Sequence, residues 1–238
     1  MSTIHFIGGE KGGVGKSVVA RLCAQYCIDR NIPFVAADAD GSHGALLRFY
    51  AAYTRPVDLA EFESADTIIG LATEAATPDR RVIVDLPAQS DRLLAAWISE
   101  AGILDLAAES GVGVVFWHVI DDGKDALTTL DRLLARYGDK ARYCIVKNLG
   151  RGRDFSLFDR SPTRATAERL GAGMIELPEL HAAAMQKIDR LDASFWSAIH
   201  GSPNVDANAD AFTRMDRQRI KVWLQATFDQ LAKLGDRF

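Results

Sequence analysis

A glycine-rich stretch near the N-terminus carries two lysines at a spacing that suits phosphate chemistry: residues 8–17 read GGEKGGVGKS. The stretch lies between a short apolar run, residues 4–7, and a helix-like segment, residues 18–29. Backbone N–H groups of a glycine-rich turn that opens a helix can surround a phosphate, and the N-terminus of the helix adds partial positive charge. Lys16 would then reach the β and γ phosphates of a nucleotide, and the Ser17 hydroxyl would ligate Mg²⁺. The stretch therefore predicts a phosphate-binding loop.

The loop departs from the ordinary pattern G-x-x-x-x-G-K-[ST] at one position, because Glu10 stands where that pattern has glycine. A second lysine, Lys11, follows directly. Residues 11–17, KGGVGKS, resemble the deviant Walker A motif of the ParA/MinD family of ATPases. In this family ATP is held between two subunits that face each other, and the first lysine of the loop crosses to the partner's nucleotide. The resemblance implies that Lys11 acts in trans, much as an arginine finger does, and that hydrolysis requires a homodimer with ATP.

The resemblance also implies which loop residues bind ATP. Val18 stands where the family often has a second threonine, so one hydroxyl contact to the α phosphate is lost. Because the backbone amide remains, we expect this difference to cost about 1 kcal/mol of binding free energy. Lys16 is expected to act on the phosphates in catalysis as well as in binding. The expected ATP-binding residues of the loop are Gly12, Gly13, Val14, Gly15, Lys16, Ser17 and Val18.

Carboxylates follow two of the apolar runs that read as buried strands. Residues 34–37 lead into Asp38 and Asp40, and residues 82–84 lead into Asp85. In parallel α/β sheets ligands gather at the carboxyl ends of the strands, so these side chains are expected beside the phosphate-binding loop. An acidic residue in the position of Asp85 can hold the hydration shell of Mg²⁺.

The strand-end aspartates resemble the switch segments of the same family. The resemblance implies that Asp40 orients the attacking water and that Asp38 supports Mg²⁺ or the loop. It also implies that Ser17 and Asp85 hold Mg²⁺ directly or through water. The chain departs from many partition ATPases at residues 41–44, which read GSHG where those proteins have Pro-Gln-Gly. This departure affects the detail of the first switch segment and leaves Asp40 in place.

Asn148 ends a later apolar run and looks like the family's adenine-contacting residue. An asparagine after a strand is also a common turn former, so the residue has two interpretations. Its position after the other three motifs favours the contact with adenine.

Length and composition favour one α/β domain. The chain has 238 residues, 48% of them hydrophobic and 25% charged, which suffices to bury a core without a disulfide or a metal. Apolar runs alternate with helix-like segments, so we predict a doubly wound, mainly parallel sheet flanked by helices. We expect residues 1–238 to form a single deviant Walker A ATPase domain. Within it, residues 57–62 read as a weak strand, and residues from about 211 to 234 as a C-terminal amphipathic helix that packs on the sheet.

Several classes of protein find little support in the sequence. Cys23, Cys27 and Cys144 include no C-x-x-C pair, so we interpret them as buried apolar residues, which argues against a metallochaperone-type relative. The loop does not match the G-x-G-x-x-G of dinucleotide-binding proteins. No apolar run approaches the ~20 residues of a membrane span, and the first residues lack the regions of a signal peptide. A cytoplasmic protein is therefore expected.

Two hypotheses about function remain open. In the first, the chain is a ParA-like ATPase, slow and stimulated by a partner protein, that acts in plasmid or DNA partition, plasmid stability or conjugative mobilisation. In the second, it is a MinD-like positioning ATPase that acts on membrane or protein cargo, although the polar ending at residues 235–238 argues against a membrane. Because the net charge is −4, nonspecific DNA binding would need a local basic patch. The residues proposed for this patch are Arg151, Arg153, Arg160, Arg164, Arg190, Arg214, Arg217, Arg219 and Lys221.

Overall fold

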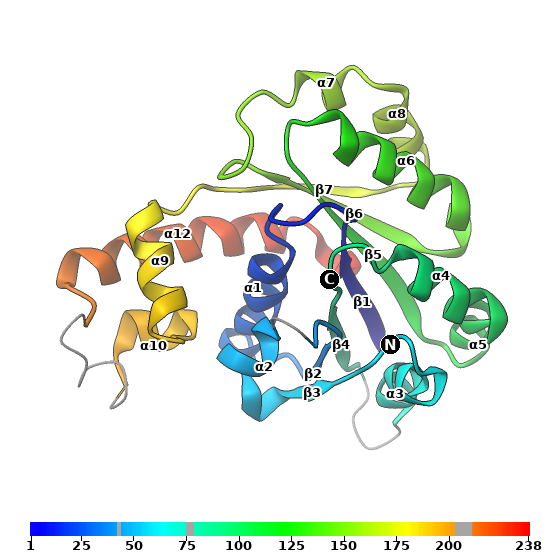
Figure 1. The fold of residues 1–238 in the computed structure, drawn as a ribbon, viewed down its shortest axis with the longest axis horizontal. Coiled ribbons are helices and arrows are strands. Elements are labelled where there is room, and N and C mark those ends of the chain that lie inside the picture. The colour runs from blue at the N-terminus through cyan, green and yellow to red at the C-terminus, as the bar shows by residue number, and fades with distance from the viewer. Residues whose placement is uncertain (42–43, 75–78, 203–210) are drawn as a thin grey trace.

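The computed structural model describes residues 1–41, 44–74, 79–202 and 211–238. Its strands form one seven-stranded sheet in the order β3-β2-β4-β1-β5-β6-β7 (Figure 1). Every strand pair in this sheet is parallel. The predicted doubly wound α/β class is therefore confirmed. The strands are β1 (Thr3–Gly8), β2 (Phe34–Asp38), β3 (Thr54–Pro56), β4 (Arg81–Asp85), β5 (Gly113–Ile120), β6 (Arg142–Asn148) and β7 (Gly173–Leu177).

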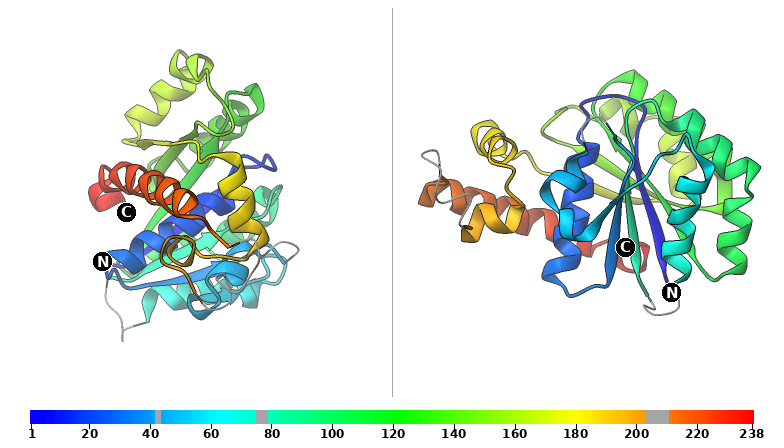
Figure 2. Two further views of the ribbon diagram at one scale, coloured as in Figure 1. Left: turned by 90° about the vertical axis from the view of Figure 1, so that its left-hand side faces the viewer. Right: turned by 60° about the horizontal axis from the view of Figure 1, so that its bottom comes forward.

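Helices cover both faces of the sheet (Figure 2). On one side of the sheet, one hydrophobic core joins α1 (Lys16–Asp29), α2 (Ala45–Phe49), α9 (Ala182–Arg190), α10 (Phe195–His200) and α12 (Arg214–Ala232). On the other side, a second hydrophobic core joins α3 (Phe62–Thr73), α4 (Asp91–Glu100), α5 (Ile103–Glu109), α6 (Lys124–Tyr137), α7 (Ser156–Asp159) and α8 (Pro162–Arg169).

The central strand β1 divides its side chains between the two cores. Ile4 and Phe6 point to the α4 side, whereas Ile7 points to the α1 side, as the period of two in a strand requires. Since β1 pairs with both β4 and β5, the segments that follow these three strands meet at one edge of the sheet. This edge is where a ligand site is expected in an open parallel sheet.

The predicted strand at residues 57–62 is wrong. The strand here is β3, Thr54–Pro56, and Phe62 already belongs to α3. Val57 and Leu59 are both buried, so the segment has the alternating pattern of a strand. However, the chain turns at Asp58. Its carboxylate accepts a hydrogen bond from the backbone N–H of Ala60 at 2.8 Å, an Asx-turn.

The C-terminal helix α12 packs its apolar side against the fold. The Trp223 indole donates a hydrogen bond to the Pro178 carbonyl at 2.7 Å, which ties α12 to the segment after β7. Together α9, α10 and the beginning of α12 extend beyond the edge of the sheet (Figure 1). Among the helices described, none has both the length and the hydropathy that a bilayer span requires. The buried residues of α12 are Ile220, Trp223, Leu224, Thr227, Phe228 and Leu231.

His5 lies in the middle of β1 and is fully buried. Its Nδ1 atom accepts a hydrogen bond from the Trp117 indole at 3.1 Å, so the ring proton of the neutral histidine belongs on Nε2. Burial lowers the pKa of His5 to about 3, and the charges of Arg81 and Arg142 act in the same direction.

We expect the neutral His5 ring to make the protein less stable in acid. The unfolded chain binds a proton near pH 6.5 that the folded protein binds only near pH 3, so stability falls between these values. From pH 7.5 to pH 5 the free energy of unfolding should decrease by about 2 kcal/mol through this group. Urea unfolding at both pH values should show that His5→Gln loses this part of the pH dependence. The same dependence in both proteins would contradict the prediction.

Candidate nucleotide-binding site

The phosphate-binding loop connects the end of β1 to the beginning of α1. Gly15 occupies the N-cap position of α1 with a φ of 106°, in the left-handed region that favours glycine. A Cβ atom at Gly15 would lie 2.4 Å from the Asn148 side-chain nitrogen, so the close approach also requires glycine. Among the described residues, no side chain caps the first turn of α1. Its N–H groups are therefore available to an anion.

Lys16 is the buried lysine of the loop, with 7% of its surface exposed. Its ammonium group donates a hydrogen bond to the Lys11 carbonyl at 2.9 Å. Burial lowers the pKa of Lys16, and the carboxylates of Asp85, Glu10 and Asp40 oppose this shift. The ammonium thus lies within the loop, near three negative charges that compete for it.

Asp85 and Asp38 stand side by side at the ends of β4 and β2. The strand register pairs them directly, and it also pairs Asp85 with Ile7, which faces α1. Neither carboxylate oxygen of Asp85 has a hydrogen-bond partner of ordinary geometry in the described part of the chain. Burial raises the pKa of Asp85 to about 7, while the Ser17 hydroxyl favours the charged form and the charge of Asp38 opposes it.

This arrangement fits Mg²⁺ bound together with a nucleotide. A cation at Asp85 would offset the burial of this carboxylate and would relieve its repulsion with Asp38. Residues 1–41, 44–74, 79–202 and 211–238 contain no group of three His, Cys, Asp or Glu side chains placed to hold a metal. Phosphate oxygens and water would therefore have to complete the coordination, as Mg²⁺ ordinarily allows.

Asp38 organises the segment that follows β2 as well as facing the site. One of its carboxylate oxygens accepts a hydrogen bond from the Asp40 N–H at 3.1 Å and the other from the Leu47 N–H at 3.0 Å. Asp40 is held next to the loop and contributes to the electrostatics of Lys16. The chain departs from the partition ATPases at residues 41–44, of which residues 42–43 lie outside the described residues.

Lys11 points away from Lys16, toward an acidic group at the end of β5. Its ammonium forms an ion pair with Asp121. The hydrogen bond and charge of Asp121 raise the pKa of Lys11, with smaller contributions from Asp125 and Asp122. Sequence reasoning missed this pairing. The signal was present, because Asp121 also follows a buried apolar run and β5 adjoins β1.

Asn148 is buried beside the loop, and both ends of its amide have partners. The nitrogen donates to the Val14 carbonyl at 2.7 Å, and the oxygen accepts from the Gly150 N–H at 3.0 Å. The residue also lines a pocket of about 270 Å³ that runs from Gly15 and Val18 to Pro178. In this structure Asn148 braces the loop at the edge of this pocket, and its contact with adenine stays a prediction.

The basic residues proposed for DNA lie on two parts of the fold. The first group surrounds α7 and α8, and the second lies on α9 and α12 (Figure 1). Some of these side chains are engaged within the protein: Arg164 pairs with Asp159 and Glu168. Arg151 lies between the rest of the first group and the second, because it lines a pocket together with residues of α9. The first group is Arg151, Arg153, Arg160 and Arg164, and the second is Arg190, Arg214, Arg217, Arg219 and Lys221.

Comparison with known sequences finds relatives at moderate identity. No protein-family model matches the chain. It is 28% identical over 184 residues to protein MobD of Acidithiobacillus ferrooxidans, which covers 75% of this chain and 78% of MobD. It is 26% identical over 244 residues to a protein TraL of Escherichia coli, which covers 97% of this chain and 98% of TraL.

Solved structures agree on the fold. The MinD cell division protein of Aquifex aeolicus matches with a TM-score of 0.54 at 12% identity, over 96% of this chain and 98% of that chain. A chain of the MinC:MinD cell division protein complex of Aquifex aeolicus matches with a TM-score of 0.56 at 12% identity, over 96% of each. The chain has a MinD-type fold, and the resemblance to the ParA/MinD ATPases is confirmed at this level.

We expect Asp85→Asn to stabilise the nucleotide-free protein at alkaline pH. The unfolded carboxyl ionises near pH 3.8 and the folded one near pH 7, so the free energy of unfolding falls as the pH rises between these values and stays at the lower level above them. The gain from the substitution should be about 2–3 kcal/mol larger at pH 8 than at pH 5.

Urea unfolding at the two pH values measures this gain, with the exposed Glu63→Gln as the control. The control should show no such difference. A gain from Asp85→Asn that is equal at both pH values would contradict a buried, uncompensated charge.

Proposed function

We propose that this chain is a slow ATPase that dimerises when it binds ATP. The observation that carries the proposal is the position of Lys11, which is 42% exposed on the phosphate-binding loop and paired with Asp121. A lysine held outside its own phosphate cradle is available to a facing subunit. This supports the action in trans that the deviant Walker A motif implies.

The remaining residues have distinct tasks in this proposal. The loop backbone and the first turn of α1 bind the phosphates, and Lys16 neutralises part of their charge. Ser17 and Asp85 hold Mg²⁺, which when bound neutralises charge on the phosphate oxygens. Asp40 orients the attacking water. The Asp38 carboxylate keeps Asp40 in place by accepting a hydrogen bond from its backbone N–H.

The pairing of Lys11 with Asp121 gives dimerisation a defined cost. Asp121 keeps the lysine charged, and Lys11 must leave this carboxylate to reach another subunit's nucleotide. The phosphates of bound ATP offer more negative charge than one aspartate, so the exchange is favourable only when the partner carries nucleotide. A nucleotide-dependent dimer follows from this competition.

Plasmid or DNA partition, stability or conjugative mobilisation is the role that we propose for this switch. The similarity to MobD and TraL over most of the chain supports a place among plasmid-associated proteins. Nonspecific DNA contact would use either of the two basic groups. Retention of duplex DNA that weakens steeply with salt would be its signature.

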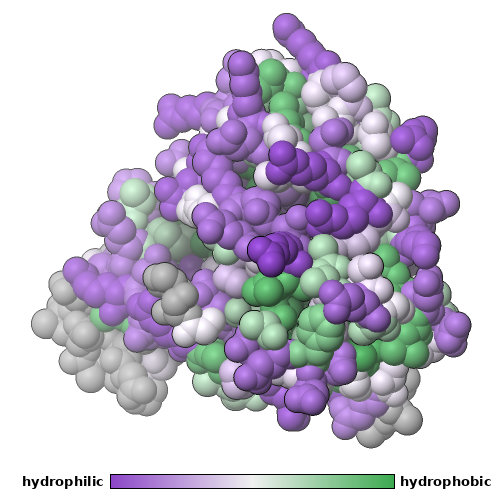
Figure 3. All heavy atoms as spheres, turned by 45° about the vertical axis from the view of Figure 1, so that its right-hand side comes forward, coloured by the Kyte–Doolittle hydropathy of each residue, from purple (hydrophilic) through white to green (hydrophobic). Residues whose placement is uncertain are grey.

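A positioning ATPase with protein cargo is the second candidate. It is favoured by the likeness to a chain of the MinC:MinD complex. Membrane cargo has less support, because the apolar side of α12 is buried in the fold. On the face seen in Figure 3, hydrophobic atoms lie in patches separated by hydrophilic ones. ATP-bound dimers that ignore DNA at low salt would favour protein cargo.

The ATP-bound protein should have twice the mass of the monomer in light scattering, whereas the ADP-bound protein should be monomeric. Lys11→Ala and Asp40→Ala should each reduce ATP hydrolysis by at least about a hundredfold, because each removes a group that acts in the transition state. Asp40→Ala should still dimerise. Lys124→Ala, an exposed lysine at the start of α6, serves as the control and should keep wild-type hydrolysis. A protein that binds ATP and stays monomeric would overturn the proposal.

A further inference from the structure

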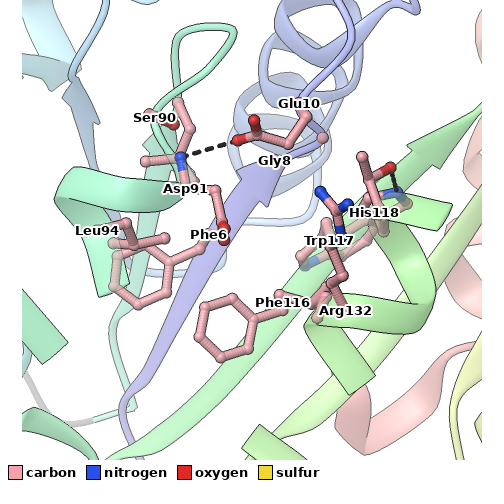
Figure 4. A pocket seen from close by; sticks show the side chains of 14 residues that line it. Phe6, Gly8, Glu10, Ser90, Asp91, Leu94, Phe116, Trp117, His118 and Arg132 are labelled. Atoms are coloured by element: carbon pink, nitrogen blue, oxygen red, sulfur yellow. Dashed lines mark hydrogen bonds between the residues drawn. The ribbon is translucent and has the colours of Figure 1, made fainter. Parts of the chain in front are cut away.

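The side chain of Glu10 reaches across from the phosphate-binding loop to the first turn of α4. Its carboxylate accepts a hydrogen bond from the Asp91 N–H at 2.9 Å (Figure 4). Asp91 is the first residue of α4, and the preceding residue, Ser90, gives its own hydroxyl to the Pro87 carbonyl at 2.9 Å. Glu10 therefore supplies the side-chain cap of this helix from a distant part of the chain.

Backbone contacts strengthen the connection between the loop and the turn before α4. The Gln89 N–H donates to the Glu10 carbonyl at 3.3 Å. Gln89 has a φ of 61°, a left-handed conformation that is uncommon for a residue other than glycine. A Cβ atom at Gly12 would lie 4.0 Å from the Ala88 Cβ atom. The loop thus fixes a strained turn, residues 87–90, directly after the strand that ends in Asp85.

Because Glu10 is charged, its contact with α4 should respond to phosphates bound in the loop. The Glu10 carboxylate is close enough to Lys16 to help to keep it protonated. Phosphates in the loop would compete with Glu10 for Lys16 and would repel the Glu10 carboxylate. The contact that still stabilises this carboxylate is then the N-terminus of α4. On its other side, α4 is held by the ion pair of Asp91 with Arg136 of α6, at 2.7 Å.

A cavity lies beside the hydrogen bond between the Glu10 carboxylate and the Asp91 N–H, which we call the clamp. It has a volume of about 60 Å³ and lies between Glu10, Asp91 and Leu94 on one side and β5 and α6 on the other (Figure 4). His118 and Arg132 line its far wall. The first turn of α4 therefore has unfilled space on this side.

We propose that Glu10 is a positioning residue that couples the occupancy of the phosphate-binding loop to the turn at residues 87–90 and the start of α4. The ordinary loop pattern has glycine at this position and lacks a side chain for the task. In the nucleotide-free protein Glu10 holds α4 against the loop. The response to nucleotide rests on the proposed function, whereas the clamp in the free protein does not.

Hydrogen–deuterium exchange of a peptide that spans residues 87–97 tests the clamp without nucleotide. Glu10→Ala should speed exchange of these amides by about tenfold, because the first turn loses its cap. Glu10→Asp keeps the charge but is one methylene too short, so it should behave like Glu10→Ala. Glu10→Gln keeps the acceptor and should remain close to wild type. Glu100→Ala, at the other end of α4, is the control.

Unchanged exchange at residues 87–97 in both Glu10→Ala and Glu10→Asp would overturn the clamp. Exchange of peptides from β1 and β5 shows whether each variant is correctly folded. A general increase over the whole chain in both would show a role in folding instead and would likewise overturn the proposal.

The same peptide with Mg-ATPγS and with Mg-ADP tests the coupling. Wild type should show different exchange at residues 87–97 in the two nucleotide states, and Glu10→Ala should lose this difference while it still binds both nucleotides. A difference that persists in Glu10→Ala would overturn the coupling. If wild type bound neither nucleotide, the proposed function would fail, and the nucleotide-free comparison would still decide whether Glu10 holds α4.

Discussion

A buried carboxylate with no cation beside it in the described part of the chain to balance its charge is the constraint on which this site depends. Asp85 ends β4 beneath the first turn of α1, where water is excluded and its own pKa is raised to about 7. Such a charge is unfavourable in the free protein and becomes favourable when a cation and its anionic partner arrive. The fold can hold it there because β1, β2 and β4 pair in register, so the strand ends cannot move apart independently.

Two residues distinguish this loop from an ordinary phosphate-binding loop, and their side chains contact different elements. Glu10 turns toward α4, and Lys11 turns toward Asp121 at the end of β5. Both contacts use a charge that bound nucleotide would disturb, since phosphates repel Glu10 and attract a lysine. In our proposal, a change in the loop is transmitted to the elements that Glu10 and Lys11 contact, and the glycines that follow Lys11 form the phosphate cradle.

The sequence predicted which residues of the candidate site lie together better than it predicted the segments around them. The loop, Asp38, Asp40 and Asp85 could be placed together because apolar runs that end in polar residues have a fixed meaning in a parallel sheet. The pairing of Lys11 with Asp121 spans 110 residues and depends on strand order, which no local pattern encodes. The strand predicted at residues 57–62 failed because the Asx-turn of Asp58 overrode the apolar alternation. The basic residues of α8 and α12 lie apart because these two helices pack on opposite faces of the sheet.

The central claim is that Lys11 serves the nucleotide of another subunit, and mixing two inactive variants tests it most directly. In the proposed dimer, Lys11→Ala and Asp40→Ala subunits combined in equal amounts would form heterodimers in which one site has its own Asp40 and receives Lys11 from the partner. If Lys11 acts in trans, the mixture should recover about a quarter of the wild-type rate, because about half of the dimers are mixed and each has one complete site. If the mixture is no more active than the separate variants, Lys11 acts within its own subunit and the account is wrong.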